Sequence, residues 1–409
     1  MKPTVLKTVV PQGTVGSNPT PSANNNASMT KFCIHANAGI SLVSATGKLM
    51  PCCKYNADDT INSIYDVTTL NGLHSTSQYK HIQEQLDAGT WPKGCDYCKT
   101  TEADDRQSRR QHTNQMYKEL DMYAPGYVQD MEIALDYTCN MMCRMCNPGA
   151  SSKWNIAQSV IKQFAEHSID LDGNNQYRSY QDQLRSVLDN TDLSHARIVK
   201  IEGGEPFYAK NLEWFLDKLD REVVDKHNLY LNIFTNGSIY PSIKVLEKLA
   251  KLNAAIIFSI DAVGELASTI RWGVDWDVIA DNIGKWRKFV DTNPKMSLQT
   301  NITVSLLNVN RLSPLIDFCN NVGIVMNFSE LTFPGYLSIY QLPIAVRQQW
   351  VYDDERLTAM IMSDVVVEQE FSKFIASVNI LDAYQGYSFE TVNSEMYQLI
   401  QSLFPCCEA

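Results

Sequence analysis

The chain has 409 residues, of which 44% are hydrophobic and 20% charged, a composition ordinary for a globular protein. It contains no run of about 18 apolar residues, so a membrane-spanning helix is excluded. The formal net charge of -11 argues against a protein whose main role is to grip nucleic acid. Residues 1–30 are rich in Pro, Ser, Asn and Thr and lack an apolar core. They therefore predict a disordered tail rather than a secretory signal, and a cytoplasmic protein.

The segment 31–115 has an irregular pattern. Ile40–Val43 is predicted to form a short strand, residues 45–47 a turn, and Tyr79–Ala88 a helix. Because its apolar residues form few runs, we expect a poor core that a bound metal or cluster would complete.

From about Met131, short apolar runs alternate with longer amphipathic stretches, which predicts parallel βα units in an α/β fold. Six such units are too few for a closed eightfold barrel. The predicted strands are Met131–Asp136, Ile198–Glu202, Leu229–Phe234, Ala255–Ile260, Ser297–Val304 and Ile324–Phe328. The predicted helices between them are Leu212–Val224, Ser242–Leu252, Trp276–Val290 and Leu312–Asn320.

Two further segments flank or interrupt this pattern. Residues 168–190 are polar and rich in Asn and Gln, which indicates an insertion. Residues 336–409 are predicted to be a helical extension, with the helices Ala345–Val351, Asp354–Met362 and Val366–Val378. The chain is thus expected to divide into a tail (1–30), a small cysteine-bearing module (31–115), an α/β domain (125–335) and this extension.

The eleven cysteines are unevenly placed, and eight of them lie within the first 146 residues. A chain without an export signal keeps its cysteines reduced, so they are ligands, nucleophiles or core residues. The clustering favours metal or cluster binding.

Three cysteines, Cys139, Cys143 and Cys146, share one short loop directly after the first strand of the βα series. Soft thiolates at this spacing suit an iron–sulfur cluster, and three ligands would leave one iron open, as in catalytic metal sites. The alternatives are a zinc site or core cysteines. Zinc normally closes with a fourth Cys or His, which Asn147 and Pro148 do not offer.

Gly203-Gly204-Glu205-Pro206 follows the second strand, some 60 residues after the cysteine loop. Together the two motifs resemble the radical S-adenosylmethionine superfamily, over about residues 131–333. The resemblance implies a partial six-stranded (β/α)6 barrel, similar to a TIM barrel, with a 4Fe–4S cluster on Cys139, Cys143 and Cys146. The unique iron would chelate the methionine moiety of S-adenosylmethionine, and reductive cleavage would give a 5′-deoxyadenosyl radical that abstracts hydrogen from the substrate. Met145 would pack near adenine, and Gly203–Pro206 would contact the methionine amino group.

Polar residues gather where the predicted strands end, the position at which barrels place catalytic groups. The resemblance implies that Asn236, Ser259 and Asp261 hold the ribose hydroxyls and the carboxylate of the cofactor. The alternative is that each is an ordinary turn or cap residue. Arg271 is a candidate to bind a carboxylate of the cofactor or the substrate. A structural salt bridge is the favoured interpretation. The residues at the strand ends are Asp136, Glu202, Thr235-Asn236-Gly237, Ser259 and Asp261, and Asn301 or Ser305.

The second cysteine set is N-terminal and consists of Cys33, the adjacent pair Cys52 and Cys53, and Cys95-x-x-Cys98. The last pair alone fits a redox pair, zinc or an iron–sulfur cluster. Cys33, one of the adjacent pair and Cys95/Cys98 make four thiolates. This set resembles the SPASM/twitch modules that hold an auxiliary 4Fe–4S cluster, here placed before the barrel rather than after it. The spacing from the preceding glycine slightly favours Cys52 over Cys53, and structural zinc is the alternative.

Other candidates are weaker. His35 ranks below any cysteine as a ligand, and Cys319 is predicted to be a core residue. The basic stretch Arg106–His112 suits a grip on a carboxylate or phosphate, although a solvated linking helix is favoured. Cys406 and Cys407 could reach a cluster but are more simply incidental.

The resemblance implies a radical enzyme, of oxidoreductase or transferase type, that modifies a peptide or protein and takes electrons from a flavodoxin or ferredoxin. One alternative is modification of a small metabolite, sugar, nucleotide or nucleobase. Another is a non-catalytic iron–sulfur electron-transfer or sensing protein. The open ligand position and Gly203–Pro206 argue against the latter, because simple electron carriers close their clusters with four ligands.

Overall fold

The computed structural model describes residues 31–42, 47–56, 62–119, 121, 123–171 and 177–403. The predicted tail, Val43, most of the turn predicted at 45–47, and Cys406 and Cys407 lie outside the described residues. Within these ranges no helix has the length and apolar character needed to cross a membrane.

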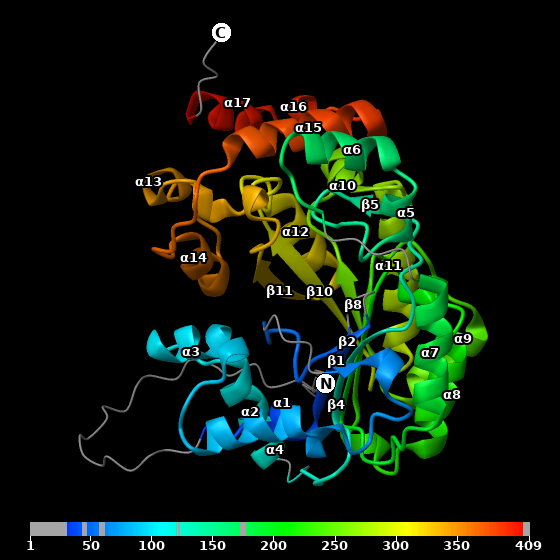
Figure 1. The fold of residues 1–409 in the computed structure, drawn as a ribbon. Helices are drawn as coiled ribbons and strands as arrows, with labels where there is room; N and C mark the ends of the chain where they lie inside the picture. Colours follow the sequence, from blue (N-terminus) through cyan, green and yellow to red (C-terminus); the bar gives the residue numbers. More distant parts are fainter. Residues whose placement is uncertain are drawn as a thin grey trace, which may run out of the picture.

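A seven-stranded parallel sheet forms the centre of the α/β fold, with strand order β1-β4-β6-β7-β8-β10-β11 (Figure 1). Each of the six predicted strands is present within two residues of its expected bounds. The sheet is open, because β1 and β11 do not pair with each other in the described chain. Its closure into a partial barrel stays a prediction. The strands are β1 Gly39–Leu42, β4 Asp130–Ala134, β6 Ile198–Glu202, β7 Tyr230–Thr235, β8 Ala255–Ser259, β10 Ser297–Val304 and β11 Val325–Glu330.

The seventh strand, β1, comes from the N-terminal segment, and the sequence did not place it in this sheet. It runs parallel to β4, with Gly39 beside Asp130 and Leu42 beside Ile133. The expectation of a poor core in this segment is wrong, because its scattered apolar side chains join the main core. These include Leu49, Ile64, Leu73, Tyr79, Ile82 and Leu86.

The two faces of the sheet differ in chemistry. On one face the side chains are apolar and fully buried, such as Val199, Ile233 and Ile302. On the other face, which we call the polar face, alternate residues are half-buried and mostly polar. The polar face consists of Lys200, Glu202, Asn232, Phe234, Ser259, Gln299, Asn301, Thr303, Asn327 and Ser329.

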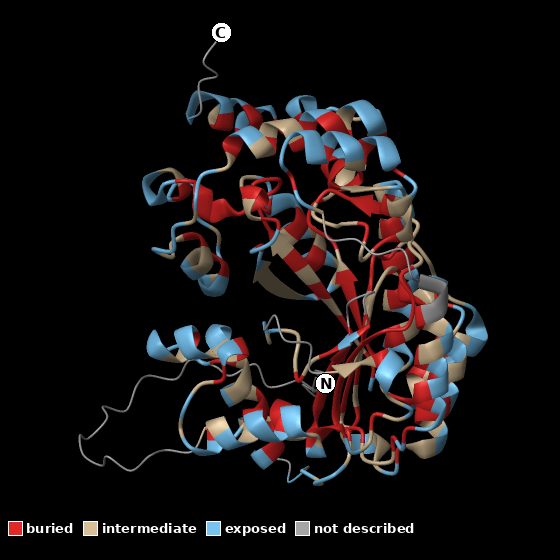
Figure 2. Ribbon diagram, viewed as in Figure 1, coloured by how far each residue is buried: buried red, intermediate tan, exposed pale blue. Residues whose placement is uncertain are grey.

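Helices cover the apolar face, and their outer sides are exposed in Figure 2. The four predicted helices of the βα units are confirmed as α8 Leu212–Glu222, α9 Ile243–Lys251, α11 Trp276–Asp291 and α12 Ser313–Val322. The N-terminal helices are α1 Ile34–Ala38, α2 Ser77–Asp87, α3 Asp96–Ala103 and α4 Arg109–Glu119. Shorter helices after the cysteine loop and β8 are α5 Ser152–Asn155, α6 Gln158–Glu166 and α10 Gly264–Ile270.

The C-terminal region is helical, as predicted. Its third helix lies later than expected, because α15 begins at Phe371 rather than near residue 366. The helices are α13 Ile344–Arg347, α14 Glu355–Ile361, α15 Phe371–Gln385, α16 Phe389–Val392 and α17 Ser394–Leu403.

The polar segment expected as an insertion contains a packed helix, α7 Tyr177–Asp189. Its Leu184, Val187 and Leu188 are buried in the core. Tyr180 is fully buried and its hydroxyl donates to the Ala134 carbonyl at 2.7 Å. Apolar residues at helical spacing therefore attach this segment to β4 despite its polar composition.

We expect Tyr180→Phe to lower the free energy of unfolding by about 1 kcal/mol, because the buried Ala134 carbonyl loses its hydroxyl donor while the ring packing is kept. Urea unfolding followed by circular dichroism measures this difference. No loss of stability would show that the bond does not hold α7 against the sheet.

Candidate functional site

The three-cysteine loop lies at the carboxyl end of β4. Its short strand β5, Met142–Cys143, pairs antiparallel with β9, Arg271–Trp272, so that Cys143 stands opposite Arg271. Cys143 is buried, and Cys139 and Cys146 are half-buried. The structure thus joins the cysteine loop to the residues that follow β8.

Nitrogen donors point at two of the three sulfurs. The Met141 backbone N–H donates to Cys139 Sγ at 3.4 Å, and Asn236 Nδ2 lies 3.9 Å from the same sulfur. Arg271 Nη1 lies 3.8 Å from Cys143 Sγ. Donors of this kind stabilise thiolate charge and are the surroundings that iron–sulfur ligands use. The donor set therefore fits a cluster held by Cys139, Cys143 and Cys146.

Burial governs the protonation of these thiols. It raises the pKa of Cys139, Cys143 and Cys146 to about 12, so each thiol carries its proton at neutral pH. A metal bound here would replace those protons and compensate the charge that burial otherwise disfavours.

The C-terminal helix α15 holds the loop from behind. Arg144, between Cys143 and Cys146, is buried, forms an ion pair with Asp382, and donates from Nε to the Thr269 carbonyl at 2.8 Å. Gln385 Nε2 donates to the Met142 carbonyl at 3.2 Å. Sequence reasoning missed this support, because nothing local marks residues more than 200 positions away as partners.

The Gly203–Pro206 turn packs directly against the cysteine loop. Gly203 has φ +118°, and a Cβ there would lie 2.4 Å from the Asp136 carbonyl oxygen. A Cβ at Gly204 would lie 2.3 Å from the Thr138 carbonyl oxygen. Two glycines are therefore required for this close approach, which brings the two predicted motifs together.

Glu205 ties the end of β6 to the end of β7. Its buried carboxylate accepts from the Thr235 hydroxyl at 2.8 Å, the Asn236 backbone N–H at 2.7 Å and the Phe207 N–H at 3.1 Å. Burial raises the pKa of Glu205 to about 7, against the effect of these donors. Pro206 begins a single 3₁₀ turn. A contact of this turn with a cofactor stays a prediction.

The other predicted cofactor residues lie at strand ends near the loop. Asn236 Nδ2 donates to Asn140 Oδ1 at 3.0 Å, and Ser259 is half-buried at the end of β8. Asp261 is buried and accepts from Arg271 Nε at 2.7 Å and from the Thr303 N–H at 2.8 Å. The favoured interpretation of Arg271 as a salt-bridge partner is thus confirmed. Met145 packs half-buried against the core, and its contact with adenine stays a prediction.

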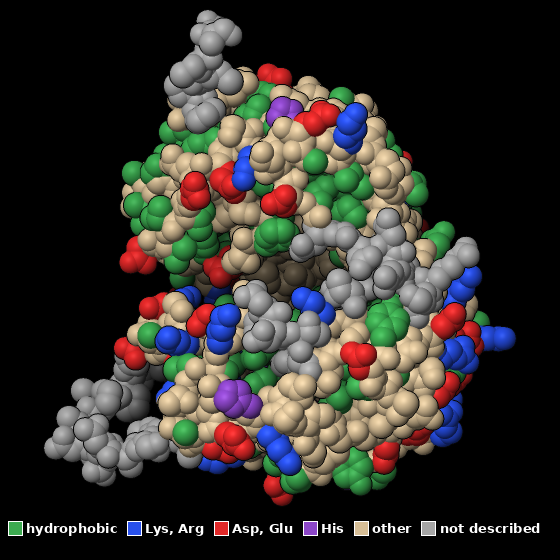
Figure 3. All heavy atoms as spheres, in the orientation of Figure 1, with side chains coloured by type: hydrophobic (Ala, Val, Ile, Leu, Met, Phe, Trp, Pro, Cys, Tyr) green, Lys and Arg blue, Asp and Glu red, His purple; other side chains and the backbone are tan. Residues whose placement is uncertain are grey.

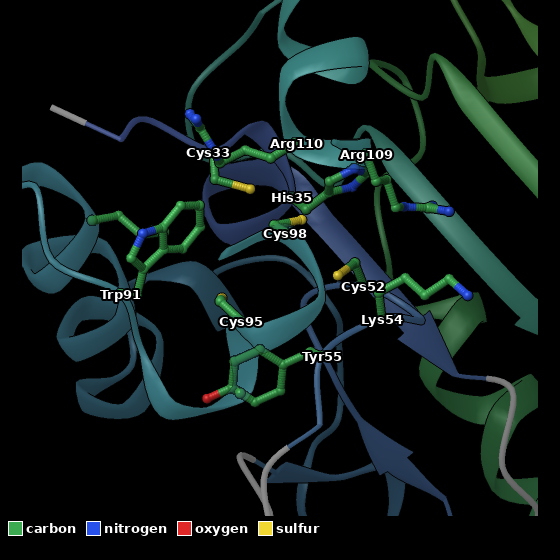
Figure 4. A pocket seen from close by; sticks show the side chains of 12 residues that line it. Cys33, His35, Cys52, Lys54, Tyr55, Trp91, Cys95, Cys98, Arg109 and Arg110 are labelled. Atoms are coloured by element: carbon green, nitrogen blue, oxygen red, sulfur yellow. The ribbon is translucent and has the colours of Figure 1, made fainter. Parts of the chain in front are cut away.

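Four N-terminal cysteines line one cavity, and Figure 4 shows their sulfurs directed into it. The cavity is small, with a volume of about 30 Å³. Cys53 is not among the lining residues, and its backbone N–H donates to Glu132 at 3.2 Å. The lining cysteines are Cys33, Cys52, Cys95 and Cys98.

In the described ranges, no group of three or more His, Cys, Asp or Glu side chains lies close enough together to hold a metal ion. The auxiliary cluster stays a prediction.

The basic stretch is solvated only in part, because Arg106 and Gln107 are exposed whereas Arg109 and Arg110 are half-buried. Arg109 and Arg110 both line the cysteine cavity. Arg110 pairs with Glu102 at 2.7 Å, and Arg109 pairs with the buried Glu132 at 2.5 Å. The helical periodicity of the stretch gave no sign that two adjacent arginines would both turn inward toward carboxylates.

Glu132 also accepts from Lys200 Nζ at 2.9 Å. The Arg109–Glu132–Lys200 network therefore connects the cavity to the polar face of the sheet. Beside it, His35 Nδ1 lies 3.3 Å from Asp130 and its Nε2 lies 3.1 Å from the Thr113 hydroxyl. Burial lowers the pKa of His35 well below its usual value, so its ring is neutral.

Cys319 is fully buried in the main core on α12, as predicted. Figure 3 shows a hollow in the molecular surface, over the region where Figure 1 places β10 and β11. The polar face therefore lies beside an opening to the surface.

No protein-family model matches the chain, and no curated protein matches it. Two solved structures of SuiB from Streptococcus suis are similar, one bound to its precursor peptide SuiA and one to S-adenosylmethionine. In the first, identity is 15%, the TM-score is 0.37, and the match covers 69% of this chain and 59% of SuiB. In the second, identity is 14%, the TM-score is 0.37, and the coverage is 77% and 67%.

Native anSMEcpe with bound AdoMet is also similar, at 15% identity and a TM-score of 0.33, over 62% of this chain and 60% of that one. In the first of these matches the chain spans about three fifths of the other protein's length.

We expect Asp382→Ala to lower the free energy of unfolding by about 3 kcal/mol, because it leaves the Arg144 guanidinium buried without its carboxylate. Thermal and urea unfolding measure the loss. The matched control is Asp353→Ala, which removes an exposed carboxylate and should change stability by less than about 0.5 kcal/mol. Equal effects of the two substitutions would contradict the role given to α15.

Proposed function

We propose that the protein is a radical S-adenosylmethionine enzyme. The observation that carries this proposal is the contact between the three-cysteine loop and the two glycines after β6, whose missing side chains let the backbones meet. Three thiolates without a fourth protein ligand suit a cluster with one open iron. When bound, that cluster and S-adenosylmethionine would supply a 5′-deoxyadenosyl radical able to take hydrogen from a substrate.

The residues around the loop would hold and shield these groups. Cys139, Cys143 and Cys146 would bind the cluster, with Arg271 and Asn236 offsetting thiolate charge. The backbone of Gly203–Pro206 would receive the methionine amino group, and Asn236, Ser259 and Asp261 would meet the ribose and carboxylate. Met145 would contact the adenine.

A peptide or protein is the substrate class that we propose. The polar face presents amide and hydroxyl side chains in rows, and such groups pair with peptide N–H and C=O groups. The amides are Asn232, Gln299, Asn301 and Asn327.

The N-terminal cavity would hold a second 4Fe–4S cluster on Cys33, Cys52, Cys95 and Cys98. Arg109 and Arg110 at its wall suit the negative charge of such a cluster. A small acidic electron carrier, flavodoxin or ferredoxin, would supply electrons. A pure electron-transfer protein is less well supported, because it would close both clusters with four ligands.

We expect anaerobically reconstituted protein to form 5′-deoxyadenosine from S-adenosylmethionine when a reductant is added. Cys143→Ala should abolish this product, because it removes the most deeply buried of the three thiolate ligands. Liquid chromatography with mass spectrometry quantifies the nucleoside. Cys319→Ala is the control, since Cys319 lies in the core away from the loop. Retained cleavage in Cys143→Ala would overturn the proposal.

The reconstituted protein should contain about eight irons, four for each cluster. Cys52→Ser should reduce this to about four, whereas Cys53→Ser should leave it unchanged, because only Cys52 lines the cavity. Iron and zinc are measured together by elemental analysis. Loss of zinc instead of iron in Cys52→Ser would show that the module is structural.

A further inference from the structure

Glu202 occupies a distinctive place on the polar face. It is the last residue of β6 and directly precedes Gly203. It lies on the same face as Lys200. Lys200 precedes it by two residues, which is about 7 Å along the strand. Its side chain is half-buried.

The neighbouring carboxylates are all engaged. Glu132 accepts from Arg109, Lys200 and the Cys53 N–H. Glu205 accepts from three donors and Asp261 from two. Among the residues that the structure describes, the Glu202 carboxylate accepts no hydrogen bond and forms no ion pair, and Lys200 donates to Glu132 instead.

The two nearby cations are already paired. Arg109 and Lys200 both form ion pairs with Glu132, and the ring of His35 is neutral. Ionised Glu202 therefore has no cationic partner among the described residues, and a half-buried charge of this kind favours a partner of opposite sign.

Titration supports the same conclusion. Burial, together with the charge of Glu132, raises the pKa of Glu202 to about 7, although Lys200 and Arg109 act in the opposite direction. A cation at the carboxylate would offset the cost of ionising it.

We propose that Glu202 binds a cationic group of the substrate, a primary ammonium or a guanidinium, and so sets which residue is presented next to Gly203–Pro206. This inference rests on the proposed function, because it gives the substrate its chemistry. Within a peptide, the partner would be a lysine or arginine side chain near the position that is modified. The amides of the polar face would bind the backbone beside it.

The test is a calorimetric titration of the reconstituted protein at pH 8 with three small probes. These are the Nα-acetyl methylamides of lysine, arginine and norleucine, of which norleucine keeps the aliphatic chain without charge. We expect the lysine or the arginine probe to bind at least tenfold more tightly than norleucine, and the stronger of the two identifies the cation. Glu202→Gln should reduce that binding at least tenfold. Glu213→Gln, an exposed carboxylate on α8, should bind like the wild type.

A second measurement does not depend on the variant's folding. Carbodiimide coupling of glycinamide to Glu202 in the wild type, followed by mass spectrometry, should slow at least threefold with the arginine probe or with an Nζ-dimethylated lysine probe, neither of which carries a primary amine that could itself couple, and remain unchanged with norleucine. Equal binding of norleucine, unchanged binding by Glu202→Gln, or no binding of any probe would each overturn the inference. Formation of 5′-deoxyadenosine by the wild type tests the proposed function separately, so failure of one is distinguishable from failure of the other.

Discussion

The close approach of Gly203 and Gly204 to the loop after β4 is the constraint on which the site depends. Two carbonyl oxygens, of Asp136 and Thr138, occupy the positions that side chains would take. The backbone N–H groups of Gly204 and Glu205 donate to these same carbonyls, at 3.0 and 2.9 Å. Glu205 then extends the contact to β7 through Thr235 and Asn236, and Asn236 returns to Cys139. A side chain at either glycine would separate the strand ends that surround the cysteines.

A second constraint is the buried charge of Glu132. One carboxylate receives Arg109 from the N-terminal helix α4, Lys200 from β6 and a backbone N–H from Cys53. Removing any one of these donors would leave the buried Glu132 charge less compensated. The three segments are therefore held together because each of them bonds to the same buried carboxylate. This explains why the N-terminal segment, although it carries its own cysteines, is attached to the sheet.

Much of the sheet could be predicted from the sequence, because β6, β7, β8 and β10 are short apolar runs separated by amphipathic stretches. The cysteine loop and Gly203–Pro206 could also be located, since their spacing is local. The position of β1 in the sheet could not be predicted, because a strand of four residues contains too little information to specify which strand it pairs with. The Arg144–Asp382 pair and the inward turn of Arg109 have the same cause. Each depends on a distant partner that only the folded chain brings near.

The two cysteine sets differ in what surrounds them, and the sheet relates the two. The N-terminal cavity borders the first half of β4, through His35 with Asp130 and Arg109 with Glu132. The three-cysteine loop follows the end of that strand. The charged side chains of Glu132, Lys200 and Glu202 lie between them, and Glu202 is the residue next to Gly203. A substrate lying on this face would therefore meet an uncompensated carboxylate immediately before the turn that packs on the cysteine loop. Because the opposite face of the sheet is buried beneath helices, a substrate would reach that turn from the polar face, and the proposed role of Glu202 would make its charge select what lies there.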